Sequence, residues 1–448
     1  MSEQAPLNEA ALPEPAPETS IWKALANTRM LVCIFSGFSS GMPLYVLYHL
    51  IPAWLRDEGV DLKTIGLFSL IGFPYTWKFL WSPLVDHFKP PILGRRRGWA
   101  LITQVALLVT IAAFGPLNPS EDIWGVALVV GLVAFFSASQ DIVLDAHRRE
   151  LLPDVELGIG NSMFVNAYRL SMLVPGSLAL ILADQMPWST VHLIVAAFMG
   201  VGIVTTLLMP EPEPVEGISK TFKEAVVEPF KEFFARDGVR KAMFILAFML
   251  LYKLGDSMAT ALLTPFYLDL GFTKTEIGTV AKFAALWAGV AGATLGGILM
   301  IRIGINRSLW CFGVVQLVTI LGFAGLNEVG NDPMMLQLDF AWWQSEVSRG
   351  QLWLFGVVSA EYLGVGLGGA AFVAYMARTT DRRYTATQYA LLTSVMGIPR
   401  TFANASTGFI VEGVGWTNFF LICALIALPG MLLLKWVAPW GPDPRSNG

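Results

Sequence analysis

The sequence predicts an all-α integral membrane protein with twelve transmembrane helices arranged as two six-helix bundles. Three observations predict this fold: a high apolar content, apolar stretches of membrane-spanning length, and an internal repeat. Of the 448 residues, 54% are apolar and only 14% are charged, and the mean hydropathy is +0.57. A soluble globular domain carries about 25% charged residues. We therefore expect most of the chain to contact lipid.

Apolar stretches of about twenty residues recur along the chain, and each could cross the roughly 30 Å hydrocarbon core at 1.5 Å per residue. The first six lie near 29–55, 65–85, 99–117, 123–146, 161–185 and 189–209. The second six lie near 242–268, 276–300, 308–326, 352–377, 384–412 and 417–437.

The positive charges indicate which side of the membrane each loop faces. With an even number of spans, 21 of the 30 Lys and Arg residues fall on the side of the two termini. The opposite loops carry only Arg56, Lys63, Lys274 and Arg349, and the other five cations lie within spans. Because cytoplasmic loops carry the excess of Lys and Arg, both termini are predicted to be cytoplasmic.

The polar segments set the predicted domain boundaries. The first twenty residues contain four glutamates, four prolines and no Lys or Arg, which predicts a disordered cytoplasmic tail instead of a signal peptide. The predicted division is an N-terminal tail at 1–28, a bundle at 29–210, a linker at 211–240, a second bundle at 241–437 and a C-terminal tail at 438–448. Within the linker, Phe222, Val226, Phe230 and Phe233 have helical spacing. They indicate a helix lying flat on the membrane or, alternatively, a solvated linker.

An internal repeat supports the six-plus-six division. The segment PAWLRDEGVDLKTIG at Pro52–Gly66 aligns with TPFYLDLGFTKTEIG at Thr264–Gly278. Asp57 matches Asp269 and Gly59 matches Gly271 at the same offset. Each copy joins the first two spans of its half, so two homologous bundles are the simplest interpretation.

Charged residues within spans are the candidate functional residues, because a charge at the bilayer centre costs about 2.5–3.5 kcal/mol or more. Five are cations and three are carboxylates: Lys78, Arg169, Lys253, Lys282 and Arg400, with Asp141, Asp256 and Glu361. The excess of cations suits an anionic solute. The alternative is that these groups neutralise one another as structural pairs, above all Lys253 and Asp256, which are three residues apart on one helix.

Asp141 is our candidate for proton coupling, since burial of a carboxylate favours its protonated form. Lys78 or Arg169 would be its alternating counter-ion, because all three fall roughly 8–12 Å deep from the cytoplasmic end of their spans at 1.5 Å per residue. Asp145, one turn further towards the cytoplasm, would pair with Arg95, Arg96 or Arg97 in an inner gate.

Other features narrow the class of protein. The cysteines and histidines form no CxxC or HExxH pair, and no acid/base or metal constellation of a membrane transferase is evident. No large soluble domain marks a sensor. Aromatic residues surround Lys78 in Phe73–Trp81 and could hold a sugar ring or face lipid.

The chain resembles the AmpG muropeptide permease family of the major facilitator superfamily. The resemblance covers about residues 32–437. Its motifs here are SGFSSGMPL (Ser36–Leu44), DLKTIGLFSLIG (Asp61–Gly72), KFLWSPLVD (Lys78–Asp86), GRRRGW (Gly94–Trp99), SASQDIVLDA (Ser137–Ala146), YRLSML (Tyr168–Leu173), LYKLGD (Leu251–Asp256), GGILM (Gly296–Met300) and TATQYALL (Thr385–Leu392). The loop Pro83–Trp99 is similar, in degenerate form, to the signature loop of the superfamily. Alternatively it is only a positively charged inner loop.

The resemblance implies the major facilitator fold and proton-driven import of anhydromuropeptides across the bacterial inner membrane. In that family the import serves peptidoglycan recycling and the induction of β-lactamase, and it needs no cofactor or metal. Related branches carry acyl-CoA, peptides or siderophores, which leaves the cargo open. We expect a monomeric protein, not an enzyme, whose partners are its solute, protons and membrane lipids, with no nucleic acid. The polar outer loop 327–351 is longer than in the family.

The predicted site residues form three groups. Asp141 is assigned to proton coupling. The gate residues are Asp86, Arg95, Arg96, Arg97 and Asp145. Substrate binding is assigned to Lys78, Gln140, Tyr168, Arg169, Lys253, Asp256, Lys282, Glu361 and Arg400.

Overall fold

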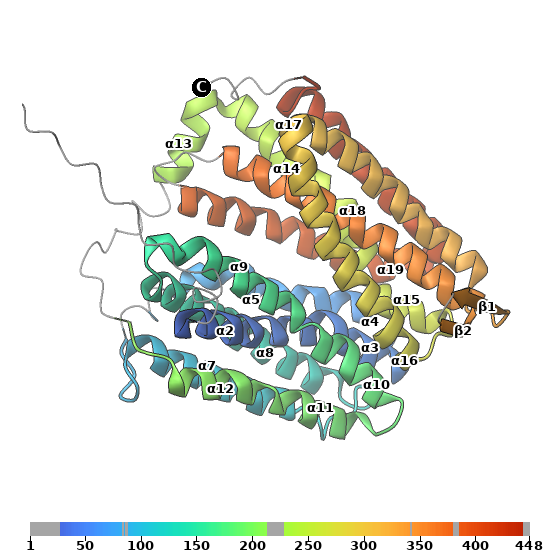
Figure 1. The fold of residues 1–448 in the computed structure, drawn as a ribbon, viewed down its shortest axis with the longest axis horizontal. Helices are drawn as coiled ribbons and strands as arrows, with labels where there is room; N and C mark the ends of the chain where they lie inside the picture. The colour runs from blue at the N-terminus through green and yellow to red at the C-terminus, as the bar shows by residue number, and fades with distance from the viewer. Residues whose placement is uncertain are drawn as a thin grey trace, which may run out of the picture.

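A computed structural model describes residues 27–82, 85, 88–212, 228–340, 343–379 and 385–441. The chain forms two helical bundles, one from the N-terminal half and one from the C-terminal half (Figure 1). Most of its helices run between two ends of the molecule. We call the end where α2 and α7 begin the termini side and the end that carries strands β1 and β2 the hairpin side. The bundles diverge towards the termini side and meet towards the hairpin side (Figure 1).

The first bundle contains six membrane-spanning units. Span 1 is α2 (Thr28–Tyr45), a π-helical turn η1 (Val46–Leu50) and α3 (Ile51–Asp57); span 2 is α4 (Leu62–Leu67), η2 (Phe68–Gly72), α5 (Phe73–Trp77) and η3 (Lys78–Leu80). Spans 3 and 4 are α7 (Arg95–Ala112) and α8 (Ile123–Leu151). Span 5 is α9 (Asp154–Leu170), η4 (Val174–Leu178) and α10 (Ala179–Ala183), and span 6 is α11 (Trp188–Ala197) and α12 (Met199–Leu208).

The second bundle repeats this order. Span 7 is α14 (Val239–Ala261) and α15 (Leu263–Asp269); span 8 is α16 (Lys274–Glu276), η6 (Ile277–Ala281) and the first part of α17 (Lys282–Val329). The second part of α17 is span 9, α18 (Arg349–Thr379) is span 10, and the two parts of α19 (Thr385–Val437) are spans 11 and 12.

The predicted number of spans is confirmed for the described residues. Eight helices are long and apolar enough to cross a membrane. Two of them, Lys274–Val329 and Pro399–Val437, contain a non-helical glycine with positive φ, Gly304 at 77° and Gly415 at 79°, so each holds two spans. Span 2 and α7 complete the set of twelve in the part of the chain that the structure describes.

Span 2 is less regular than the single helix predicted near 65–85. It consists of short α-helical and 3₁₀ segments, and Pro74 begins a new helix at α5. Proline lacks the N–H that would continue the ladder, so the helix restarts there. Irregular backbone at membrane depth is tolerated where protein or a cavity surrounds it. This irregular span carries Lys78.

The internal repeat is confirmed by backbone geometry. Gly59 and Gly271 both have a φ of 83°, a conformation that favours glycine, and both follow the first span of their bundle. The next helix of each repeat begins with a capping side chain at the equivalent position. Asp61 accepts from the N–H of Thr64, and Thr273 accepts from the N–H of Glu276.

Glycines allow close helix contacts, as is common in membranes. A Cβ on Gly37 or Gly41 would overlap the backbone of α9 at Phe164 or Tyr168. In the second bundle, a Cβ on Gly430 would overlap Tyr252 of α14. The helices that line the space between the bundles are thereby packed tightly against their own neighbours.

Two connections differ from the predictions in detail. The outer loop at 327–351 contains an antiparallel hairpin of β1 (Met335–Phe340) and β2 (Trp343–Ser348), which was not predicted from the sequence. The linker contains α13 (Glu228–Asp237), a helix over its last part. Phe222 and Val226 lie outside the described residues, so the orientation of that helix on the membrane stays a prediction.

Candidate functional site

Asp141 of α8 lies where spans 1, 2 and 4 converge. Ser40 of α2 donates a hydrogen bond of 2.6 Å from its Oγ to Oδ1 of Asp141. Lys78 Nζ lies 4.0 Å from Oδ2, at the outer limit of an ion pair, and the two side chains are 35% and 15% exposed. The structure therefore brings Lys78 and Asp141 together, with only a loose pairing that leaves both available to other groups.

The neighbouring candidates have different surroundings. Gln140 is buried and donates 2.9 Å to the carbonyl oxygen of Ser39, so it ties α8 to α2. Tyr168 of α9 packs edge-on against Tyr45, with ring centroids 5.8 Å apart. Arg169, next to it, is partly buried and has no hydrogen bond or ion pair from its guanidinium within the described residues. Arg169 is thus not the counter-ion of Asp141 in this conformation.

The second bundle holds another acidic cluster. Lys253 and Asp256 of α14 form an ion pair of 3.2 Å between Nζ and Oδ2. Glu361 of α18 is fully buried, and neither of its carboxylate oxygens has a hydrogen-bond partner in the described part of the chain. This contact is the structural ion pair on one helix that the sequence offered as the alternative to a functional role for Lys253 and Asp256.

Lys282 of α17 is a buried cation held by neutral groups. Its Nζ donates 2.8 Å to Thr264 Oγ1 and lies 3.0 Å from Nδ1 of His49. His49 belongs to span 1, so this contact crosses between the bundles. Lys282 is 4% exposed, and no carboxylate pairs with it within the described residues.

Arg400 of α19 is exposed and likewise has no hydrogen bond or ion pair from its side chain in the described regions. It lies within electrostatic reach of Tyr48 in the other bundle. Among the residues that the structure describes, three of the five cations within spans, Arg169, Lys282 and Arg400, therefore lack a carboxylate partner. A fourth, Lys78, has only its distant contact with Asp141. Cations at membrane depth without a carboxylate partner are electrostatically suited to an anion.

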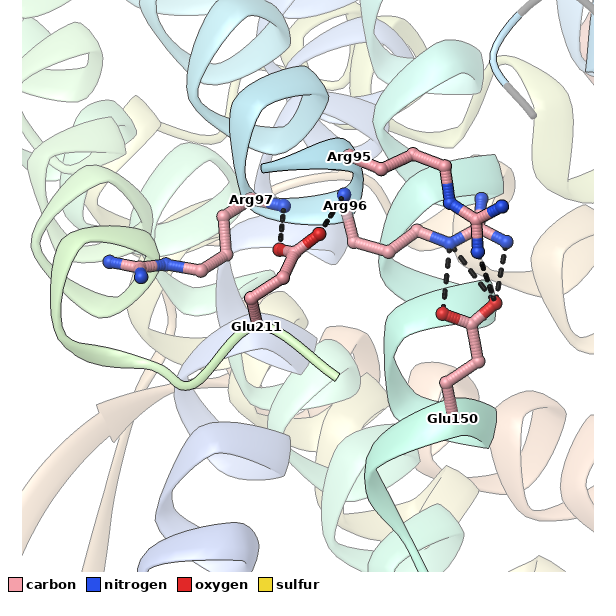
Figure 2. A network of polar contacts seen from close by, with 5 residues as sticks. All are labelled: Arg95, Arg96, Arg97, Glu150 and Glu211. Atoms are coloured by element: carbon pink, nitrogen blue, oxygen red, sulfur yellow. Dashed lines mark hydrogen bonds and ion pairs between the residues drawn. The ribbon is translucent and has the colours of Figure 1, made fainter. Parts of the chain in front are cut away.

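The arginines of the GRRRGW loop form a network within the first bundle (Figure 2). Glu211, after α12, accepts the backbone N–H groups of Arg96 at 2.8 Å and Arg97 at 2.9 Å, and so caps the start of α7. Arg96 Nη2 donates 2.6 Å to Glu150 Oε1 on α8, and Arg95 lies 3.4 Å from the same oxygen (Figure 2).

This network corrects the predicted pairing of Asp145. Asp145 pairs with Arg148 on its own helix at 2.9 Å. The acid of α8 that pairs with Arg95 and Arg96 is Glu150 instead. Residues at i and i+3 are neighbours on the surface of one helix, so Asp145 contacts Arg148 without leaving its own helix. The contacts that the structure gives Arg95, Arg96 and Arg97 stay within one bundle, and Asp86 lies outside the described residues.

Among the described residues, the ion pairs that join the two bundles lie on the hairpin side. Arg56 Nε lies 2.6 Å from Asp269 Oδ1, and Lys274 Nζ lies 2.9 Å from Asp57 Oδ2. We call these four residues the hairpin-side clasp. Lys63 adds a further pair across the bundles, 2.8 Å from Glu412 Oε2.

No role for the clasp was predicted from the sequence, although two signals could have indicated it. Three of the four cations on the poorly charged side, Arg56, Lys63 and Lys274, are those that cross to the other bundle. The two carboxylates of the clasp are also the aligned acids of the internal repeat. Cations on the side with few positive charges, together with the aligned acids of the repeat, therefore indicated an interface between the two bundles.

Two repeat-related bundles that are clasped on one side and diverge on the other, with charged residues at membrane depth, are typical of a solute transporter of two pseudo-symmetric halves. A model of the Major Facilitator Superfamily matches residues 33–344. The anhydromuropeptide permease of Escherichia coli K12 is 41% identical over 409 residues, covering 91% of this chain and 79% of that protein. An uncharacterized protein of Haemophilus influenzae is 45% identical and covers 94% of this chain and 97% of its own. The chain therefore belongs to the major facilitator superfamily and, within it, to the AmpG permease family.

Solved structures support the same fold. A mutant form of the nucleoside transporter NupG superposes with a TM-score of 0.70 over 92% of this chain and 100% of its own, at 14% identity. A likeness at that identity concerns the fold alone. The prediction of the major facilitator fold is thus confirmed.

Proposed function

We propose that the protein imports anhydromuropeptides across the bacterial inner membrane by proton-coupled alternating access. The observation that carries the proposal is the 41% identity to the Escherichia coli anhydromuropeptide permease over 91% of this chain. Such solutes are disaccharides with acidic groups. The cations Arg169, Lys282 and Arg400, which lack carboxylate partners in the described residues, could complete their pairing with these acids.

The arrangement of contacts agrees with alternating access. With the clasp formed, the site is closed towards the hairpin side, which the bias of 21 of the 30 cations assigns to the outside of the membrane. In the proposed cycle the clasp breaks when the transporter opens outward. An exchange of ion pairs between two states is a common mechanism for such rocking motions.

Asp141 supplies the proposed proton coupling. Its carboxylate is hydrogen-bonded by Ser40 and only loosely paired with Lys78, so protonation would free Lys78 for a substrate carboxylate. Loss of the proton would restore the Lys78–Asp141 pair and release the substrate. Ionisable residues within membrane spans commonly act as proton relays in this way.

The test is uptake of a radiolabelled anhydromuropeptide into vesicles that contain the purified protein, with and without an imposed pH gradient. We expect accumulation that follows the gradient. Asp141→Asn should abolish uphill accumulation and retain part of the substrate exchange. The control is Glu121→Gln, an exposed carboxylate in the loop before α8, which should behave as the unmodified protein. Absence of uptake under every gradient would exclude this cargo, and normal accumulation by Asp141→Asn would exclude the assignment of Asp141.

A further inference from the structure

Glu361 of the second bundle lies on the span that corresponds to the span of Asp141 in the first. Asp141 lies on span 4 and Glu361 on span 10, the fourth span of each half. Their surroundings differ. Asp141 is bonded by Ser40 and lies near Lys78, whereas Glu361 is 0% exposed and neither Oε1 nor Oε2 has a partner in the described residues. An unpartnered carboxylate at this depth calls for a chemical explanation.

Several polar and titratable groups lie within electrostatic reach of Glu361. They are Asp256 and Lys253 on α14, Tyr267 on α15, Thr319 on α17 and Cys423 on α19, with Tyr362 beside it on α18. Lys253 is the one cation of this set. It already pairs with Oδ2 of Asp256, and the other oxygen of Asp256, Oδ1, is buried without a partner in the described residues.

Two buried carboxylates, Glu361 and Asp256, therefore lie within electrostatic reach of one cation, Lys253. An ionised carboxylate without a partner is strongly disfavoured in such surroundings. The set of Glu361, Asp256 and Lys253 is neutral when it holds one proton and carries one negative charge without it. Interacting carboxylates of this kind bind the shared proton as a pair.

We propose that Glu361 and Asp256 form a second proton-binding site, so that each substrate moves with two protons, one on each bundle. The proposal rests on the proton-coupled import described above. The second proton comes from the outer solvent, binds a carboxylate oxygen of Glu361 and leaves to the cytoplasm when the site opens there. Without this proton the charges of Glu361 and Asp256 repel each other, and Lys253 neutralises only one of them. The site therefore favours binding a new proton when it opens to the outside.

The alternative is that Glu361 is a permanently protonated acid that only fills space. Infrared spectroscopy of the purified protein in detergent separates the two without any substrate. We expect a carbonyl band of a buried carboxylic acid that is absent in Glu361→Gln and that disappears reversibly as pH rises. A Glu361-dependent band that persists at every pH at which the protein stays folded would overturn the proposal, as would the lack of any such band.

The second measurement is the number of protons moved per substrate, obtained from the membrane potential at which net uptake reverses. We expect Glu361→Gln to halve that number. Glu361→Asp, which keeps an ionisable group, should keep the proton number of the unmodified protein. The control Glu346→Gln alters an exposed carboxylate of the hairpin. An unchanged proton number in Glu361→Gln would refute the second site. Because the infrared result needs no cargo, it stands even where the proposed cargo fails.

Discussion

Asp57 and Asp269 are aligned by the internal repeat, and each accepts from a tryptophan of its own bundle and from a cation of the other bundle. Trp188 Nε1 donates 2.7 Å to Asp57, and Trp416 Nε1 donates 3.0 Å to Asp269. Lys274 and Arg56 supply the cations. Each tryptophan stands at the start of the last span of its half. The hairpin-side clasp is therefore one motif used twice, with its cation exchanged between the halves.

The clasp should set the balance between the closed and open hairpin side. Its pairs are partly exposed, so each is worth about 0.2–1 kcal/mol. Asp57→Asn together with Asp269→Asn should therefore raise the population that is open on that side by about two- to thirty-fold. Electron spin resonance between labels at Glu58 and Asn418, exposed residues of opposite bundles, would measure it, with Cys311 replaced by Ser.

The matched control for the clasp is Asp332→Asn. Asp332 pairs with Arg349 at 3.4 Å on the same side of the molecule, within one bundle. Its loss should leave the distance distribution unchanged. A control variant that opens the hairpin side as much as the double variant would mean that general loss of charge, and not the clasp, changes the conformation.

A second closing device is the contact of α4 with α19 at Gly66 and Gly408. A Cβ on Gly408 would overlap the carbonyl oxygen of Leu62 in the other bundle. Gly408→Ala should therefore hold the bundles apart on the hairpin side, and uptake should fall roughly ten-fold or more if the overlap costs at least about 1.4 kcal/mol in the closed state. The spin labels at Glu58 and Asn418 should show a longer distance.

Gly413→Ala is the control for this substitution. Gly413 lies on the same helix, further along the chain, and a Cβ there meets nothing within 4 Å. Its uptake and label distances should match those of the unmodified protein. If Gly408→Ala also left the label distance unchanged, the glycine contact would have no role in closure.

The fold could be predicted because span length and charge bias depend only on the order of residues along the chain. Span 2 was the least regular element, since Pro74 and the 3₁₀ turns depend on what surrounds them and not on apolar content alone. The convergence of Lys78 and Asp141 was predictable from equal depth. The partner of Asp145 was not, because depth cannot distinguish Arg148 on the same helix from the arginines across the loop. Pairing across bundles, as in Arg56 with Asp269, depends on the conformation and is not encoded by spacing.

Arg169 and Arg400 are expected to bind substrate carboxylates from opposite bundles, since neither guanidinium has a partner in the described residues. A hydrogen bond to a charged group is worth about 1.5–3 kcal/mol, so Arg169→Gln and Arg400→Gln should each weaken substrate binding roughly 10- to 100-fold. An analogue whose carboxylates are converted to amides should bind the variants and the unmodified protein alike, because it lacks the charge that the arginines pair with. Titration calorimetry of both ligands measures this difference, and Arg349→Gln, whose side chain pairs with Asp332 on the hairpin side, is the control. Equal weakening of the acidic substrate and the amide analogue would show that the arginines support the fold of the cavity and do not bind the acid.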